Sequence, residues 1–285
     1  MKIIKTYINA YKVSVYDEKT HTGVLRHLVT KVGFTTNEVM VVLVANGKKL
    51  PYLKELASVL EENVPGFKTL VVNVNREKTN VILGRENIVV YGDGKINDYI
   101  GELVFEISPL SFFQVNPVQT EVLYNKALEY ADLKENDTVF DIYCGIGTIS
   151  LFLAQKAKKV YGIEIVEDAI KDAKINANLN NLDNVEFYVG KAEEVVPKMY
   201  KEGKTANVVV VDPPRKGCDE KVLDTIVSMK PDRVVYVSCN PSTLARDLAY
   251  LDERGYKCLE VQPVDMFPHT MHVECCAKIV KKSDL

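Results

Sequence analysis

From about Ser108 onward, short apolar runs alternate with amphipathic segments whose apolar residues recur at helical spacing. The runs predict strands at 138–141, 159–163, 185–189, 207–211 and 233–237. Alternation of this kind is typical of a mostly parallel sheet with helices on both faces. Two further runs, at 256–264 and 272–280, follow one another without a helix and predict closing strands. The pattern therefore predicts an α/β domain with a doubly wound, seven-stranded sheet.

The first part of the chain has a different pattern. An apolar, β-branched run at 38–45 predicts a strand, and leucines at helical spacing predict a helix over 51–63. Strands are then predicted at 69–74, 81–83, 88–91 and 103–107. We therefore expect a small α+β domain over residues 1–107 and a larger α/β domain over residues 108–285, joined by a short connection near Ser108.

Composition places the chain among ordinary globular proteins. Its 285 residues are 47% hydrophobic and 26% charged, and no apolar run is long enough to span a bilayer. The first residues do not contain the extended apolar core of a secretory signal. We therefore expect a cytoplasmic protein with no membrane partner.

Charge and cysteine spacing limit the possible partners. The formal net charge of -3 argues against a surface coated with nucleic-acid-binding cations, although phosphate contacts need only one local basic face. Residues 1–50 do lean basic, with lysine and arginine outnumbering aspartate and glutamate by eight to three. None of the six cysteines forms a C-x-x-C pair, and His269 and His272 have no carboxylate pair nearby beyond Glu274. We expect free thiols and no metal site.

Cys239 is the first candidate for covalent chemistry. It lies in Ser238-Cys239-Asn240-Pro241, between a predicted strand that ends at Val237 and a helix predicted from Ser242. A helix N-terminus supplies partial positive charge, which lowers the pKa of a nearby thiol and favours the nucleophilic thiolate. The alternative is a cysteine that serves as a small apolar residue under a turn. The tetrapeptide alone fits both.

A glycine-rich turn follows the first strand of the larger domain. In Asp141-Ile142-Tyr143-Cys144-Gly145-Ile146-Gly147-Thr148, Gly145 and Gly147 let the backbone approach a ligand closely. Glu164, at the end of the next strand, can accept hydrogen bonds from both hydroxyls of a ribose. A dinucleotide loop would have glycine where this chain has Ser150, and Asp141 would repel a pyrophosphate. Since that carboxylate suits the cationic methionine part of S-adenosylmethionine, we expect this cofactor rather than a dinucleotide.

A second turn, Asp212-Pro213-Pro214-Arg215-Lys216-Gly217, follows the fourth strand. Its two prolines stiffen the chain and remove backbone donors, so that Asp212 projects with little conformational freedom. A turn-capping aspartate is the alternative. Because the carboxyl ends of the strands share one edge of the sheet, we expect Asp212 to lie in the same cleft as Gly145, Glu164 and Cys239.

These segments together resemble the RNA 5-methyluridine methyltransferases, in particular the bacterial enzymes that act on uridines of 23S ribosomal RNA. The resemblance spans about 108–280 and rests on the order and spacing of five segments: Ser111-Phe112-Phe113-Gln114-Val115-Asn116-Pro117, 141–147, 212–217, 238–241 and His272-Val273-Glu274. It implies a Rossmann-like, class I S-adenosylmethionine-dependent methyltransferase domain, preceded by the small α+β domain.

The resemblance also implies a mechanism. Cys239 attacks C6 of a target uracil, because C5 is a poor nucleophile until C6 becomes saturated. C5 then takes the methyl group of S-adenosyl-L-methionine, which leaves S-adenosyl-L-homocysteine. Glu274 removes the C5 proton so that the thiol can depart. Burial would raise the pKa of Glu274, as suits a base, whereas a strand-edge carboxylate is the alternative for this residue taken alone.

Binding residues follow from the same resemblance. Gln114, Tyr143, Glu164 and Asp212 match cofactor-contacting positions, beside Gly145, and Asp212 also borders the uracil. The target uridine must be single-stranded or flipped out of its stack to expose C5 and C6. We expect RNA as the partner of a monomeric enzyme, with 23S ribosomal RNA preferred over transfer RNA by analogy alone.

Two aromatic and two basic residues have open roles. One of Phe112 and Phe113 is expected in the core, and the other is a candidate for stacking on a base; the sequence does not say which is which. Arg215 and Lys216 could hold a phosphate or a uracil oxygen, and a solvated loop is the alternative.

The chain departs from longer members of this family. Those members carry an N-terminal RNA-binding TRAM domain and, in many cases, a four-cysteine iron–sulfur site, neither of which is visible in this sequence. We therefore expect a C-terminal fragment with reduced RNA affinity. Two other classes remain: an adenine- or guanine-directed amino methyltransferase, which would have no use for Cys239 paired with Glu274, and a non-enzymatic RNA-binding module, which failure to bind the cofactor would favour.

Overall fold

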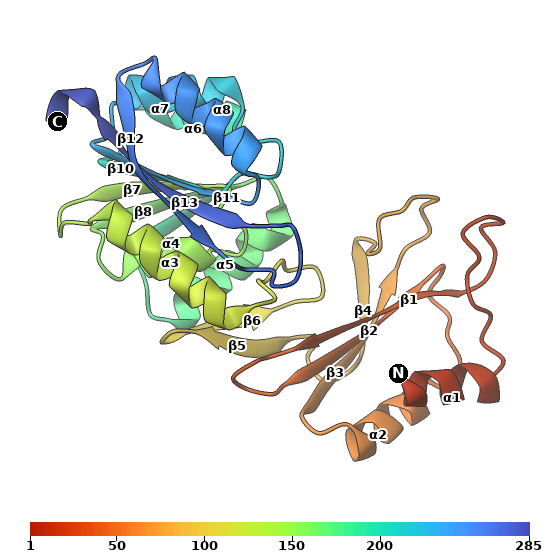
Figure 1. The fold of residues 1–285 in the computed structure, drawn as a ribbon. Coiled ribbons are helices and arrows are strands. Elements are labelled where there is room, and N and C mark those ends of the chain that lie inside the picture. Colours follow the sequence, from red (N-terminus) through yellow and green to blue (C-terminus); the bar gives the residue numbers. More distant parts are fainter. The chain divides into compact units, whose positions relative to one another are not determined.

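The computed structural model describes residues 1–285, which divide into two compact units (Figure 1). The chain passes between the units twice within one hairpin, formed by β5 (Ile96–Ile100) and β6 (Leu103–Ile107), and once more between Ser111 and Phe112. Each unit therefore has two segments: Met1–Tyr99 with Val104–Ser111 in unit 1, and Ile100–Leu103 with Phe112–Leu285 in unit 2.

Unit 1 is a four-stranded sheet that packs against two helices, α1 (Lys2–Ala10) and α2 (Leu53–Asn63). Its strands, in spatial order, are β1 (Leu25–Val32), β2 (Val39–Ala45), β3 (Phe67–Val74) and β4 (Glu86–Tyr91). The pair β2 and β3 is parallel and joined by α2, whereas the outer pairs are antiparallel. Tyr7 of α1, Leu60 of α2 and Leu43 of β2 lie in one buried apolar core.

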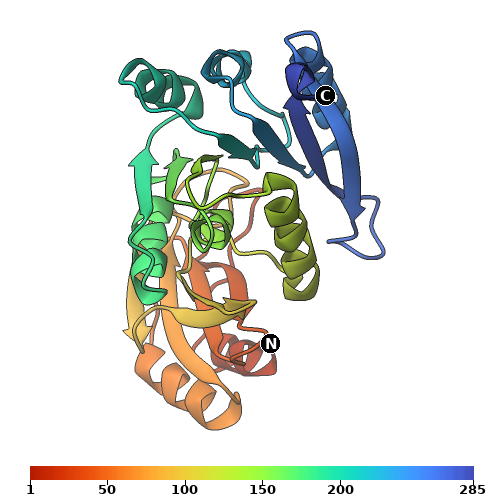
Figure 2. The ribbon, with the colours of Figure 1, turned by 90° about the vertical axis from the view of Figure 1, so that its left-hand side faces the viewer.

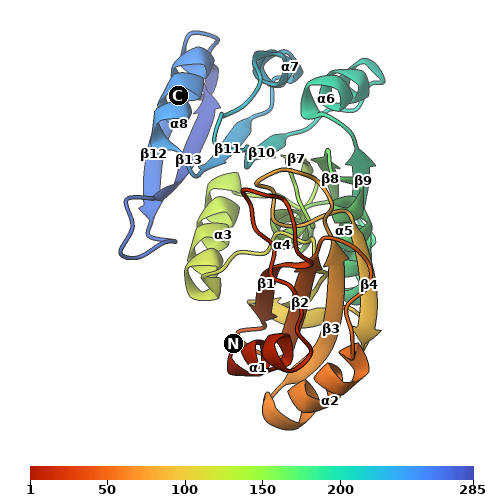
Figure 3. The same cartoon turned by 90° about the vertical axis from the view of Figure 1, so that its right-hand side faces the viewer.

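Unit 2 is a seven-stranded sheet between two layers of helices. The strand order is β12-β13-β11-β10-β7-β8-β9, and β13 runs antiparallel to its neighbours. The helices α3, α4 and α5 lie on one face, and α6, α7 and α8 lie on the other (Figure 2, Figure 3). The central strand β10 consists of four fully buried valines, as expected for a parallel strand covered on both faces.

The bounds of the strands and helices of unit 2 are as follows: α3 (Pro117–Ala131), β7 (Thr138–Ile142), α4 (Thr148–Ala154), β8 (Lys159–Glu164), α5 (Glu167–Leu179), β9 (Val185–Val189), α6 (Ala192–Lys201), β10 (Val208–Val211), α7 (Glu220–Met229), β11 (Arg233–Ser238), α8 (Pro241–Asp252), β12 (Tyr256–Val264) and β13 (Glu274–Lys281). The predicted doubly wound sheet of seven strands is confirmed. None of the helices is long and apolar enough to cross a membrane.

The expectations for unit 1 were less complete. The strand predicted at 81–83 is wrong, because the Asn75 side chain, rather than a neighbouring strand, donates to the Val81 and Ile82 carbonyls. The sequence also did not predict α1, β1 and β5. In β1 burial does not alternate, because the consecutive residues His27, Leu28 and Val29 are all partly buried, and the sequence lacks the apolar–polar alternation that marks a strand.

Candidate active site

Strand register brings the functional turns of unit 2 to one edge of the sheet. Ile142 of β7 pairs with Ile163 of β8 and with Val211 of β10, and Val211 pairs with Tyr236 of β11. Because these four strands are parallel, the segments that follow them meet at their carboxyl ends. Tyr143–Gly147, Glu164, Asp212 and Cys239 therefore share this edge.

The antiparallel strand β13 adds Glu274 to the same edge. Ser238, the last residue of β11, pairs with Cys275, so the next residues outward are Cys239 and Glu274. Cys239 is partly buried, and Glu274 is 5% exposed. Two residues that are 35 positions apart in sequence thus lie on adjacent chains.

The pKa of the Cys239 thiol lies above its usual value, opposite to the direction expected from the helix alone. Helix α8 does begin immediately after it, with Asn240 as the N-cap. Burial outweighs the helix, and the negative charges of Glu274 and Asp212 raise the pKa further. Arg215 acts in the opposite direction. In the free chain the thiol is therefore protonated at neutral pH.

Burial also raises the pKa values of the two neighbouring carboxyls. The pKa of Asp212 is raised to about 7 by burial and by the charges of Glu274 and Asp141. The pKa of Glu274 is raised by burial, while Arg215 again lowers it. The Cys239 thiol, the Asp212 and Glu274 carboxyls and the exposed Arg215 guanidinium thus interact electrostatically at one edge of the sheet. Perturbed groups of this kind are typical of catalytic sites.

The first turn of α8 holds the Arg215 segment against Cys239. Asn240 accepts a hydrogen bond from the Ser242 amide at 3.1 Å, and its Nδ2 donates to the Arg215 carbonyl at 3.0 Å. The Thr243 hydroxyl donates to the same carbonyl at 3.3 Å. Because one residue caps the helix and anchors the neighbouring turn, the nucleophile and the cation are fixed together.

Asp247, one turn further along α8, is the second anchor. Its carboxylate is 1% exposed and accepts hydrogen bonds from the Cys218 amide at 2.9 Å and the Tyr236 hydroxyl at 2.6 Å. Arg246 pairs with it at 2.7 Å and donates to the Lys216 carbonyl at 2.9 Å. A buried carboxylate is tolerated only when paired and hydrogen-bonded, and this one ties the turn after β10 to β11.

Glu164 is fixed by backbone amides at the end of β8. Its two oxygens accept hydrogen bonds from the Gly145 amide at 3.2 Å and the Val166 amide at 2.9 Å. Gly145 has a positive φ of 55°, and a Cβ built on it would meet no atom within 4 Å. The carboxylate therefore sits above open space with acceptor capacity left for the hydroxyls of a ribose.

Asp141 lies beneath the same turn. It is fully buried and accepts a hydrogen bond from Ser150, while its Oδ1 has no partner. Burial raises the pKa of Asp141 to about 7. An orphaned carboxylate oxygen below a glycine turn fits a cationic or hydrogen-bond-donating ligand. The carboxylate acceptors of Glu164 and Asp141 and the open space at Gly145 fit S-adenosylmethionine better than a pyrophosphate.

The remaining predicted cofactor residues differ in how they are placed. Tyr143 has a left-handed φ of 73°, and its ring packs against the core under α6–α8, where burial raises the pKa of its hydroxyl. Only its backbone belongs to the glycine turn. Gln114 is partly buried in the segment before α3. This segment is held by Asn116, whose Nδ2 donates to the Met266 carbonyl at 3.2 Å.

Phe112 and Phe113 are distinguished by exposure. The Phe112 ring is 73% exposed, whereas Phe113 is partly buried. Phe112 is therefore the one of the two that is free to stack on a base. No group of three or more histidine, cysteine, aspartate or glutamate side chains is arranged to hold a metal ion.

The sequence analysis did not identify the α8 residues that hold the turn after β10. Thr243, Arg246 and Asp247 follow Asn240 at spacings of three, six and seven residues, which puts them on one face of a helix. That face meets the turn after β10. The spacing could have identified these residues once Asn240 was recognised as the N-cap.

Comparisons with known proteins cover almost the whole chain. Residues 1–282 match the family model of tRNA (uracil-5-)-methyltransferases. A protein described as an uncharacterized RNA methyltransferase of Clostridium tetani is 58% identical over 274 residues, or 96% of this chain and 60% of that protein. A relative with the same description from Caldanaerobacter subterraneus is 56% identical over 98% of this chain and 62% of its own length. The chain thus spans less than two thirds of these relatives.

A solved structure resembles both units. The tRNA (uracil-54, C5)-methyltransferase of Pyrococcus abyssi, crystallised with S-adenosyl-L-homocysteine, superimposes with a TM-score of 0.83 at 36% sequence identity. The match covers 98% of this chain and 66% of that one.

Proposed function

The chain belongs to the tRNA (uracil-5-)-methyltransferase family, and from this membership we propose that it methylates C5 of a uridine in RNA. One observation carries the proposal: the pairing of β11 with β13 puts Cys239 beside Glu274, next to the Asp212 turn. An amino methyltransferase needs neither a thiol nor a base at these positions, and a passive RNA-binding module needs no raised pKa values.

The cofactor of the proposed reaction is S-adenosylmethionine. Glu164 would hold the ribose, Gly145 would let the backbone approach the ligand, and the Asp141 side would face the cationic sulfonium end. Gln114, Asp212 and the backbone of Tyr143 complete the proposed site. When bound, the cofactor supplies an electrophilic methyl group.

The chain's own residues would perform three steps. The Cys239 thiol gives its proton to one of the neighbouring carboxylates, and the thiolate, stabilised by Arg215, adds to C6 of uracil. Saturation of C6 makes C5 an enolate carbon able to accept the methyl group. Glu274 then takes the C5 proton, the C6–S bond breaks, and the thiol leaves. With its pKa near neutrality, Asp212 can donate or accept a hydrogen bond at the uracil edge.

Glu164→Ala is expected to weaken cofactor binding. The change removes two charge-assisted hydrogen bonds to ribose hydroxyls, each of about 1.5–3 kcal/mol. A loss of about 10²- to 10⁴-fold in S-adenosylmethionine affinity should follow, measured by calorimetry. Glu167→Ala, in the exposed first turn of α5, is the matched control. Equal affinity in the Glu164 variant and the wild type would remove Glu164 from the ribose role.

A trapping experiment tests the function. The chain is incubated with S-adenosylmethionine and a 5-fluorouridine-substituted RNA, and products are analysed by mass spectrometry. Since fluorine cannot leave C5 as a proton does, an RNA–protein adduct through Cys239 is expected to accumulate. If the cofactor binds but neither a 23S ribosomal RNA fragment nor a transfer RNA fragment gives an adduct, uridine C5 methylation is contradicted.

The same trapping experiment, run with a ribosomal and a transfer RNA fragment, distinguishes the two candidate substrates. We propose 23S ribosomal RNA, by the resemblance of 108–280 to the ribosomal enzymes, and transfer RNA is the second candidate because the Pyrococcus abyssi relative is a tRNA enzyme. Fragments of both should be offered in the same concentration series. An adduct with the tRNA fragment alone would overturn the ribosomal assignment.

A further inference from the structure

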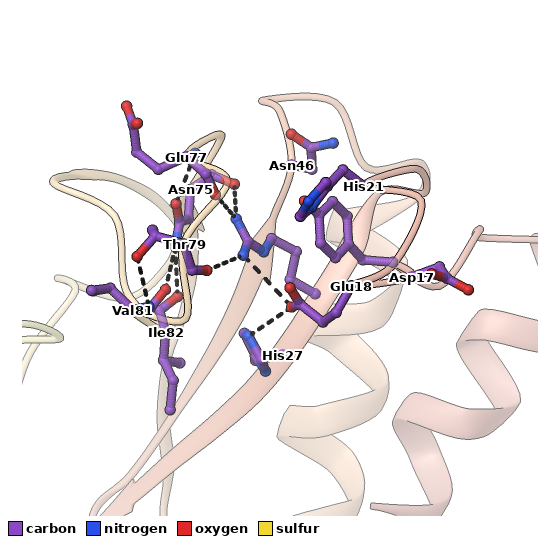
Figure 4. Close-up of polar contacts among 12 residues, drawn as sticks. Asp17, Glu18, His21, His27, Asn46, Asn75, Glu77, Thr79, Val81 and Ile82 are labelled. Atoms are coloured by element: carbon purple, nitrogen blue, oxygen red, sulfur yellow. Dashed lines mark hydrogen bonds and ion pairs between the residues drawn. The ribbon is translucent and has the colours of Figure 1, made fainter.

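One loop of unit 1, residues 75–85 between β3 and β4, has an unusual support. Three buried polar side chains hold its backbone: Arg26, with a fully buried side chain, Asn73 at 0% and Asn75 at 2% exposure. Figure 4 shows Asn75 among the loop residues Glu77, Thr79, Val81 and Ile82. None of the loop's residues belongs to a strand or helix. Its conformation therefore depends on these side chains.

Arg26 fixes the first half of the loop. Its Nη1 donates to the carbonyls of Asn75 at 3.1 Å and Glu77 at 2.7 Å, and its Nη2 donates to the carbonyl of Thr79 at 3.0 Å. The guanidinium also lies 4.4 Å from the centre of the Tyr16 ring and 3.6 Å from Glu18. Alternate carbonyls thus point inward to one cation.

The residues between those carbonyls are the basic ones. Arg76 and Lys78 are exposed, and no carboxylate lies within ion-pair distance of either. The backbone bends at residues 77–80 around the Arg26 guanidinium, and the Arg76 and Lys78 side chains remain exposed to solvent. The two cations are therefore displayed from a fixed backbone.

Asparagine side chains fix the second half. Asn75 Nδ2 donates to the carbonyls of Val81 at 2.7 Å and Ile82 at 3.0 Å. Asn73 exchanges two hydrogen bonds with Gly84, at 2.8 and 2.7 Å. The residue after Gly84 is Arg85, which is exposed and has no carboxylate partner.

The charge of the loop contrasts with that of the chain. Residues 75–85 carry Arg76, Lys78 and Arg85 against the single acid Glu77, whereas the whole chain has a net charge of -3. Burying an arginine to support a surface loop costs free energy. A backbone already fixed in one conformation loses less entropy when it binds a partner. Exposed cations on a fixed backbone match a polymer of phosphates.

We propose that the 75–85 loop is an RNA-binding element of unit 1, in which Arg76, Lys78 and Arg85 contact phosphates of the substrate. The identity of the RNA as a substrate rests on the proposed function, whereas the phosphate contacts rest on the loop itself. An anionic membrane is the competing partner for a basic surface.

The test replaces Arg76, Lys78 and Arg85 together with glutamine. Binding of a fluorescent, uridine-containing single-stranded RNA is followed by anisotropy between 50 and 200 mM salt. Each lost phosphate contact lowers the slope of log K against log salt by about 0.7, so three contacts lower it by about 2. Over this fourfold range the wild type should then lose roughly 16-fold more affinity than the variant. Cofactor affinity should not change.

A matched control removes the same charge elsewhere. Lys156, Lys158 and Lys230 are exposed and precede β8 and β11, at the edge of the unit 2 sheet opposite the candidate active site. Their triple glutamine variant should bind RNA with the wild-type slope. Equal slopes in the wild type and the loop variant would overturn the proposal, as would binding to phosphatidylserine vesicles but not to RNA. Anisotropy measures binding and needs no turnover, so the two proposals can fail separately. If the wild-type chain forms no 5-fluorouridine adduct but the loop variant still shows the reduced salt slope, the RNA-binding role of the loop is supported and only the methylation is refuted.

Discussion

Cys239→Ala should abolish methylation while leaving S-adenosylmethionine affinity unchanged. Without the thiol, C6 of uracil stays unsaturated and C5 remains a poor nucleophile, so the remaining residues can only position the reactants. Loss of a covalent nucleophile costs on the order of 10⁴-fold or more in rate. Binding should survive because the Glu164 carboxylate and the glycine turn are fixed by their own backbone contacts, without Cys239.

The measurement is transfer of a labelled methyl group to RNA, with cofactor affinity determined by calorimetry on the same preparation. Cys258→Ala is the control, because Cys258 is also a partly buried free cysteine but lies on β12 away from the carboxyl edge. The control should methylate at the wild-type rate. An alanine variant at position 239 that still methylates would end the nucleophile assignment.

Much of unit 2 could be predicted because its central strands are buried on both faces. A parallel strand between two helical layers is a continuous apolar run, and the fully buried β10 (Val208–Val211) lies within the predicted 207–211. The more exposed edge strands β9 and β12 also begin and end at the predicted residues, 185–189 and 256–264. The strands of unit 1 were harder to predict from sequence, since β1, for example, is only half-buried. The 81–83 run is apolar yet forms no strand, because the Asn75 side chain, rather than a neighbouring strand, donates to the Val81 and Ile82 carbonyls.

The candidate site was predictable in its membership but not in its electrostatics. Turns at the ends of parallel strands must meet at one edge, so Gly145, Glu164, Asp212 and Cys239 could be grouped from sequence. The direction of the thiol pKa could not be predicted, because burial and two carboxyls outweigh one helix N-terminus. That balance depends on how deeply the turn is buried.

A raised thiol pKa has a consequence for catalysis. A thiol that is protonated in the free chain is protected from oxidation, since reactivity follows the thiolate. The same carboxyls that suppress the thiolate have raised pKa values and can themselves take up a proton. In the proposed reaction, proton exchange within this group can therefore produce the thiolate when uracil binds.

Glu274→Gln should trap the covalent RNA–protein intermediate. Attack at C6 and methylation at C5 need the thiol and the cofactor, but elimination needs a base to remove the C5 proton. General base catalysis contributes about 10²- to 10⁴-fold, so release should slow by that factor and an adduct through Cys239 should survive denaturing electrophoresis. The adduct should carry the methyl group, which mass spectrometry of the linked nucleotide detects.

A second measurement on the same variant needs no RNA. The Glu274 charge raises the pKa of Cys239, so glutamine should lower that pKa and speed alkylation of the thiol by iodoacetamide at neutral pH. Glu260→Gln, which removes an exposed carboxylate from β12, should change neither alkylation nor turnover. Normal turnover without an adduct in Glu274→Gln would show that another group removes the C5 proton. Unchanged alkylation would show that Glu274 does not face the thiol, and then the pairing of β11 with β13 could not be the basis of the chemistry.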